Sequence, residues 1–353
     1  MKERVYIYLS LLTAAVLLLL TAGCTKKNLD NDLPYITFGV AGVDASTKAD
    51  TKGLITGFTS ATLPNVYVYG VQNNTEQIFN GDQITKENDS NNWNTGTRYY
   101  WSSGSSYSFY GYTSSPASSP TCLLKISNSG MTIDVSQPST YSENDMVDYM
   151  LSHAYKVADG SNYHVVMLYM QHAMAWVEIV VKKQMDDHQI TLNSIELRNI
   201  FRSATMQCEY QAIANKGESN VWLTTLSGNN NQTYSKEYPD FNPSGNFLGK
   251  MSILAVPQQL YSETVLSVNY TVDEDGTSDT GGDKTYTDDF QLFNYVPFVW
   301  ESGHKITYTL TINTGVELKA EISDWKEAGY TEGIILPPAS PGTGEEGEND
   351  NVA

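Results

Sequence analysis

The first residue with chemistry to offer is Cys24, which follows an apolar stretch near the amino terminus. Two basic residues form a short positive head, residues 5–20 are almost all apolar, and an Ala-Gly pair stands directly before the cysteine. This layout is typical of a secretory signal, with a cysteine whose thiol receives a diacylglycerol before cleavage. We therefore expect residues 1–23 to be a lipoprotein signal peptide and Cys24 to hold the chain to a membrane through buried acyl chains.

A group of carboxylates is the second candidate site, in this case for a cation. The segment DEDGTSDTGGD contains four closely spaced oxygen donors, Asp273, Asp275, Asp279 and Asp283, with glycines that permit tight turns. Calcium prefers such ligands, although the spacing is not that of an EF-hand and no bidentate glutamate ends the loop. The alternative is a solvated hairpin loop, because short acidic β-turns are common.

Aromatic residues form the third candidate site. Seven aromatic rings crowd the segment YYWSSGSSYSFYGY, residues 99–112. Side chains alternate between the two faces of a strand, so a β-hairpin turning at SSGSS would send one set of rings into a core and leave the other on the surface. Exposed rings stack on sugars, and Tyr100, Tyr110 and Tyr112 are the candidates for a glycan site. The structural interpretation, in which the rings pack in and on a sandwich, is the one that we favour.

No arrangement of residues predicts an enzyme. The sequence contains no G-x-S-x-G, H-E-x-x-H, phosphate-loop or G-x-G-x-x-G motif. Its five histidines are scattered, and His164 and His172, which share strand parity, lie eight residues apart, too far along one strand to hold one metal ion. We expect no catalytic residues, no cofactor and no firm metal site.

The net charge of the chain excludes one class of partner. The formal charge is −19, and residues 1–23 carry two basic residues and one acidic residue, so the mature chain carries −20. Nucleic acid is not expected as a partner, because its phosphates require Lys and Arg. Only Cys122 and Cys208 remain after lipidation. They form either two buried thiols or one disulfide. In either case the hydrophobic core must supply most of the stability of the fold.

The organisation of the rest indicates β structure. Short alternating apolar runs, 24 tyrosines and abundant Thr, Ser and Asn favour strands, and no amphipathic helix of ordinary length is evident. A mature chain of this length suggests two domains, and the charged stretch KKQMDDHQ marks the boundary. We predict a polar tether, two β-sandwich domains and a flexible acidic tail at residues 24–33, 34–184, 185–332 and 333–353, respectively.

Several phrases follow one another in an order that resembles one protein family. After the motif at Cys24 come TRYYWSSGSSYSFYGYTSSP, DYMLSHAY, VVMLYMQHAMAWVEIVV, ILAVPQQ, WESGHKITYTLTI and ISDW. Each phrase alone is a weak motif, but their collinear order is fairly specific. The sequence resembles the fimbrillin family of Bacteroides-type bacteria, which comprises type V pilus subunits and related surface lipoproteins.

The resemblance implies an all-β fold of two tandem transthyretin-like (Greek-key) β-sandwich domains behind the signal peptide. It also implies strand exchange, in which a protease removes the first strand, here residues 34–40, and a donor strand from another subunit fills the groove. The family's shaft subunits resemble substrates of an arginine-specific protease, whereas this chain has no arginine between Arg4 and Arg98. Processing would therefore fall at Lys48 or Lys52, or the subunit stays unprocessed as an anchor, a tip or a stand-alone surface protein.

These observations predict a structural subunit or accessory component, anchor or tip, of a cell-surface fimbria that supports adhesion. The expected partners are other fimbrial subunits or copies of the same chain, outer-membrane lipid through Cys24, and a host glycan or protein ligand. The alternative is a non-polymerising outer-membrane lipoprotein adhesin or glycan-binding module. A secreted hydrolase is a third class, which the missing catalytic residues disfavour.

Overall fold

The computed structural model shows a chain folded almost entirely into β-strands. Its described residues contain one helical element, the 3-10 helix η1 (Leu292–Asn294). Among them, no helix has the length and apolar character needed to cross a bilayer. The structure describes residues 34–41, 65–86, 93–115, 124–127, 130–160, 165–184, 189–209, 222–239, 245–273, 282–313 and 315–325. The predicted all-β fold is confirmed.

An eight-stranded sheet forms one end of the molecule. In hydrogen-bonded order its strands are β10 (Gln171–His172), β8 (Asp148–Val157), β5 (Ser106–Ser115), β2 (Val66–Gln72), β3 (Glu76–Lys86), β4 (Trp93–Thr95), β1 (Phe38–Ala41) and β9 (Val166–Tyr169). Met150 of β8 and Val166 of β9 come from distant positions in this order, yet both are buried in one hydrophobic cluster. The sheet therefore curls around its own core.

A four-stranded sheet covers the other face of β5. Its order is β14 (Leu223–Ser227), β13 (Ser203–Glu209), β7 (Gly130–Ser136) and β6 (Leu124–Ser127). Tyr110 of β5 shares a buried cluster with Met131 of β7 and Cys208 of β13. Because both faces of β5 are covered, all residues from Tyr107 to Ser114 are buried. The prediction that one set of rings would lie on the surface is wrong for this strand.

Two further four-stranded sheets form the opposite end. One has the order β16 (Phe247–Ala255), β11 (Ala175–Lys183), β21 (His304–Ile312) and β22 (Val316–Asp324); the other has β15 (Gln232–Glu237), β12 (Gln189–Ile200), β18 (Val265–Asp273) and β19 (Asp283–Gln291). The short strands β17 (Gln258–Gln259) and β20 (Val299–Trp300) pair with each other. Alternate residues of β11, such as Val177 and Ile179, pack with Leu192 and Leu197 of β12 in one core.

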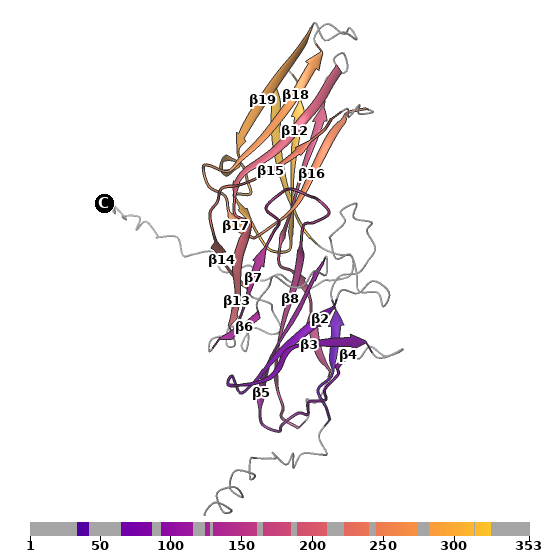
Figure 1. Ribbon diagram of the computed structural model, residues 1–353, viewed down its shortest axis with the longest axis vertical. Coiled ribbons are helices and arrows are strands. Elements are labelled where there is room, and N and C mark those ends of the chain that lie inside the picture. Colours follow the sequence, from indigo (N-terminus) through magenta and orange to yellow (C-terminus); the bar gives the residue numbers. More distant parts are fainter. Residues whose placement is uncertain are drawn as a thin grey trace, which may run out of the picture.

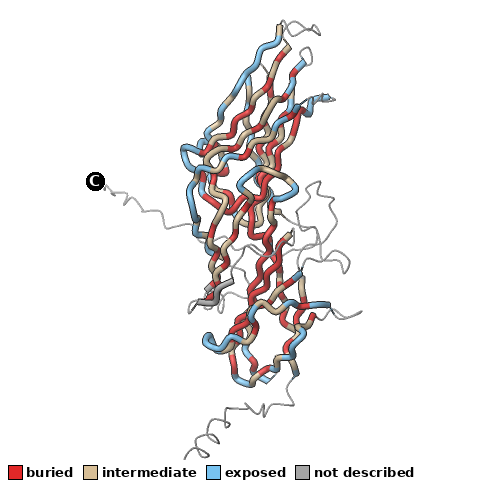
Figure 2. The backbone as a smooth tube through the Cα atoms, in the orientation of Figure 1, coloured by how far each residue is buried: buried red, intermediate tan, exposed pale blue. Residues whose placement is uncertain are grey.

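The sheets are interleaved along the sequence. Strand β11 lies before the predicted boundary at 184/185, yet it pairs only with β16 and β21, which lie after it. Conversely, β13 lies after the boundary and pairs with β7. The predicted boundary therefore does not coincide with a boundary between sheets. The molecule is elongated (Figure 1), and buried positions follow its interior from one end to the other (Figure 2).

The predicted hairpin over residues 99–112 is also wrong. Strand β5 pairs with β2 and β8, not with the residues before the turn. Those residues pair with the segment that leads into β1: the N–H of Ile36 donates to the carbonyl of Tyr99 at 2.7 Å, and the N–H of Trp101 donates to the carbonyl of Pro34 at 3.2 Å. The aromatic-rich segment thus bridges two parts of the sheet instead of folding back on itself.

Candidate functional site

The first strand, β1, lies inside the eight-stranded sheet, between β4 and β9. It runs parallel to β9, in a register that begins at Phe38↔Val166, and antiparallel to β4, where Phe38 lies opposite Trp93. The N–H of Val166 also donates to the carbonyl of Thr37 at 2.8 Å. Strand β1 therefore satisfies backbone groups of both neighbours at once, like an inserted strand.

A single side chain anchors this strand in the core. Phe38 is fully buried, and its ring meets those of Phe79 and Phe109 edge to face, with centroids 5.4 and 5.6 Å away. Burial of such a ring stabilises by about 1.5–3 kcal/mol, and each aromatic pair adds about 0.5–1.5 kcal/mol. A Cβ at Gly39 would collide with the sulfur of Met167, so a side chain there would require the methionine to shift. The socket therefore selects a large ring at position 38.

The connection from β1 to β2 contains the two candidate processing positions. Lys48 and Lys52 both fall in residues 42–64, outside the described part of the chain. The signal peptide, the lipidation site Cys24, the tether and the acidic tail lie outside it as well. These assignments stay predictions. The structure describes β1, which lies between Cys24 and the two lysines in the sequence.

The candidate glycan-stacking residues do not form a platform. Tyr100 is 41% exposed, but Tyr110 and Tyr112 are buried, at 0% and 2%. Tyr110 packs against the ring of His153, with centroids 4.7 Å apart, and the hydroxyl of Tyr112 donates to Ser114. The trio is wrong as a glycan site, because the sheet that contains β7 and β13 covers the face on which Tyr110 lies.

The acidic segment joins two paired strands. Asp273 ends β18 and Asp283 begins β19, and the two residues lie opposite each other in the register. Asp275 and Asp279 lie outside the described residues. Within the described residues, no three or more His, Cys, Asp or Glu side chains are grouped to hold a metal ion. The segment is a hairpin connection between β18 and β19, and calcium binding there stays a prediction.

A buried Asp–His pair in the eight-stranded sheet, which was not predicted, contacts a tryptophan that follows β22 of another sheet. Asp148, at the start of β8, lies 2.9 Å from Nδ1 of His172 in β10, and both are buried. The indole of Trp325 stacks on the imidazole, with centroids 3.7 Å apart and planes 6° from parallel. The N–H of Trp325 donates to the carbonyl of Gly303, whose own N–H donates to the carbonyl of Met174. The end of β22 is thereby tied to the eight-stranded sheet.

The sequence contains a signal for this junction. Asp148, His172 and Trp325 belong to three different phrases of the collinear set, DYMLSHAY, VVMLYMQHAMAWVEIVV and ISDW. The structure brings these three residues of separate phrases into contact.

Two other reactive side chains belong to the interior. His153 is 2% exposed, and burial lowers the pKa of its imidazole from 6.5 to about 4, so the ring is neutral near pH 7. Cys208 is fully buried, and Cys122 lies outside the described residues. Their chemistry is that of packed side chains.

The molecule is all-β, and its first strand is inserted between two others of one sheet. A family model described as fimbrillin-like matches residues 47–325. The chain belongs to the fimbrillin-like family, which indicates a structural, non-enzymatic protein of fimbriae or cell adhesion at the cell surface. Curated protein sequences give no match.

Comparison with solved structures gives matches at low sequence identity, and the first of them shares the fold. A fimbrial protein from Bacteroides vulgatus is 15% identical, with a TM-score of 0.54 over 83% of this chain and 99% of its own. A candidate cell adhesion protein from Bacteroides uniformis is 14% identical, with a TM-score of 0.48 over 83% and 98%. A fimbrial assembly protein from Parabacteroides distasonis is 13% identical, with a TM-score of 0.38 over 82% and 96%.

Proposed function

We propose that this chain is a subunit of a cell-surface fimbria, in the shaft or as an anchor or tip, and that it assembles by strand exchange at the site of β1. The observation that carries the proposal is the position of β1, which is hydrogen-bonded on both sides while Phe38 fills an aromatic socket. Membership of the fimbrillin-like family supports assembly with other fimbrial subunits.

Loss of β1 would leave unpaired backbone groups and an empty aromatic socket in the same groove. The facing edges of β4 and β9 would expose unpaired N–H and C=O groups, which recruit another extended strand. The socket lined by Phe79 and Phe109 would open to water, and only a large apolar side chain refills it. A donor strand supplies both at once. Because β1 is parallel to β9 and antiparallel to β4, a donor that copies it inserts in one direction only.

The link to β2 decides whether β1 leaves. While residues 42–64 are intact, β1 is tethered beside its groove at a high effective concentration, and an external strand competes poorly. A cut after Lys48 or Lys52 converts β1 into a separate peptide. This peptide dissociates on dilution, and a donor strand then takes its place. Since Cys24 precedes β1, the same cut separates the body of the protein from its outer-membrane lipid. An uncut copy stays anchored, and a cut copy is free to polymerise.

The test uses the full-length protein in detergent, treated with a lysine-specific protease. We expect an amino terminus at Ala49 or Gly53, followed by multimers that resist SDS. A synthetic peptide of residues 34–41 should block these multimers by reoccupying the groove, whereas the same peptide with Phe38→Ala should not.

The matched control is the double variant Lys48→Gln, Lys52→Gln, which keeps the fold and removes both cleavage positions. It should keep β1 and remain monomeric under the same treatment, even where the protease cuts at Lys26 or Lys27 and releases the chain from the membrane. If the cut protein loses β1 and still stays monomeric at high concentration, strand exchange is wrong. Protein isolated from cells with only a lipidated Cys24 terminus would assign the anchor role in preference to the shaft.

A further inference from the structure

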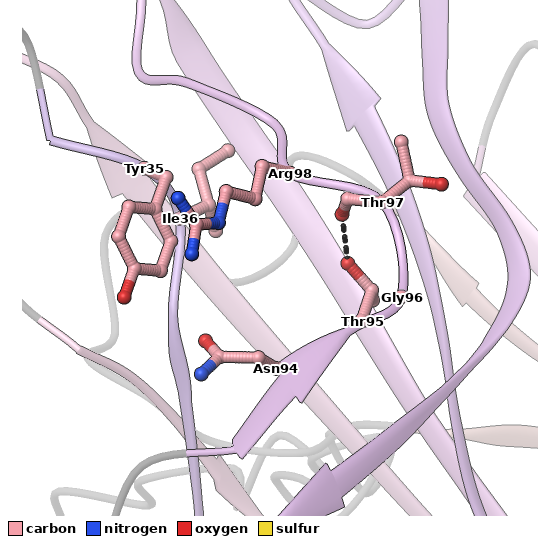
Figure 3. Close-up of a pocket in the computed structure, with 7 residues that line it drawn as sticks. All are labelled: Tyr35, Ile36, Asn94, Thr95, Gly96, Thr97 and Arg98. Atoms are coloured by element: carbon pink, nitrogen blue, oxygen red, sulfur yellow. Dashed lines mark hydrogen bonds between the residues drawn. The ribbon is translucent and has the colours of Figure 1, made fainter. Parts of the chain in front are cut away.

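A small hollow of about 210 Å³ opens beside the segment that leads into β1. Tyr35 and Ile36 form one wall, Asn94 and Thr95 of β4 form another, and the turn at residues 96–98 completes it (Figure 3). None of these lining residues is acidic, although the chain carries 40 Asp and Glu against 21 Lys and Arg. The hollow is therefore a cationic spot on an acidic protein.

The amide of Asn94 has unused hydrogen-bonding capacity at this place. Its nitrogen and oxygen are both shielded from water and have no hydrogen-bond partner in the described part of the chain. Figure 3 shows the amide directed toward Tyr35 and Arg98. A buried amide that makes no hydrogen bonds is unfavourable, and a ligand that both donates to it and accepts from it would relieve that cost.

The guanidinium of Arg98 supplies the charge. It is exposed and lies over the ring of Tyr35, 5.0 Å from the centroid. No ion pair joins it to a carboxylate among the described residues. A guanidinium offers a planar fork that matches a carboxylate with two parallel hydrogen bonds.

We propose that this hollow binds an acidic sugar, with Arg98 on the carboxylate and Asn94 on the neighbouring hydroxyl groups. A sugar hydroxyl is both donor and acceptor, which is what an amide without partners requires. One cation suits a singly charged carboxylate, whereas a phosphate ester carries a charge of about −1.5 to −2 and would call for more basic residues. The hollow has room for one sugar ring.

The site requires the uncut chain. Tyr35 and Ile36 precede β1 directly, so the hollow is complete while the amino-terminal segment is retained and loses one wall if that segment is removed. Sugar binding is therefore tested on the uncut protein, where its success or failure is separate from that of polymerisation.

The test compares D-glucuronate with D-glucose, which differ in the carboxylate at one carbon, by calorimetric titration of the full-length protein in detergent. We expect glucuronate to bind and glucose to bind at least about tenfold more weakly, because hydrogen bonds to a charged group are the strong ones. Arg98→Gln should weaken glucuronate binding about 10- to 100-fold. Arg98→Lys should also weaken it, because a lysine keeps the charge and loses the fork.

Two more variants separate binding from folding. Asn94→Ala should weaken glucuronate binding severalfold without lowering the melting temperature, because it removes an amide that makes no hydrogen bonds. Arg198→Gln, which changes an arginine paired with Asp289 in another sheet, should leave the affinity unchanged. Four results would each overturn the proposal: neither sugar binds, glucose binds as well as glucuronate, acetate binds as well as glucuronate, or Arg98→Gln binds glucuronate like the unaltered protein.

Discussion

Replacement of the buried His153 should change how the stability of the protein depends on pH. Burial holds the pKa of this imidazole at about 4 in the folded chain, against 6.5 in an exposed one. At pH values between these two pKa values, His153 binds a proton in the unfolded chain but stays neutral in the folded chain. The free energy of unfolding therefore falls as the pH falls. Above pH 7 both states are neutral and the histidine contributes no pH dependence.

The two pKa values set the size of the effect. One pKa unit corresponds to about 1.4 kcal/mol. Titration of His153 alone therefore removes about 2 kcal/mol of stability by pH 5 and about 3 kcal/mol by pH 4. A loss of this size is a substantial part of the 5–15 kcal/mol or so that stabilises a typical domain.

The assay is urea unfolding, followed by tryptophan fluorescence at several values between pH 7.5 and pH 5, for the unaltered protein and for His153→Phe and His153→Gln. Other titrating groups are the same in all three, so the differences between the curves isolate one imidazole. Both variants should lose about 2 kcal/mol less over this range, whatever their stability at pH 7.5. Parallel curves for all three proteins would refute the assigned burial of His153.

Two other changes test the first strand and the junction, both by urea unfolding at pH 7.5. Phe38→Ala should lower the free energy of unfolding by about 3–5 kcal/mol, because it empties the socket between Phe79 and Phe109; a loss below 1 kcal/mol would mean that β1 is not anchored there. Asp148→Ala should cost about 3–5 kcal/mol, as expected when one partner of a buried pair is removed, and Asp148→Asn, which keeps an acceptor for His172, should cost clearly less.

The local sequence pattern predicts strands in which buried side chains alternate with exposed ones or follow one another without a break. The alternating apolar residues of NVYVYGV and MAWVEIVV are typical of strands, and these segments form β2 and β11, with alternate side chains facing a core. Strand β3 was not predicted, since only Phe79 and Ile84 of its residues are buried and the rest are polar. Strand β4 lies in an Asn-rich stretch, a composition typical of a loop, and it is three residues long.

Long-range pairing is what the pattern could not supply. Nothing in the residues around Tyr99 distinguishes a hairpin from a segment that pairs with residues 34–36, because both need the same extended backbone. The burial of Tyr110 depends on β7 and β13, which are distant in sequence. The contact between Asp148 and His172 is also long-range. The sequence shows the two phrases that contain these residues, but it does not show that the residues meet.

The interleaving of the sheets has a consequence for how the polypeptide can be divided. Both strands that pair with β11 lie in the carboxyl-terminal half of the chain. Strand β7 also pairs with a strand of that half, β13. A fragment ending at residue 184 would carry β11 as a strand with no neighbour and would leave Tyr110 without the part of its cover that β13 supplies. The complementary fragment would have a gap at the middle of a sheet. Neither piece is an autonomous folding unit, and only co-production of the two would allow them to complement each other.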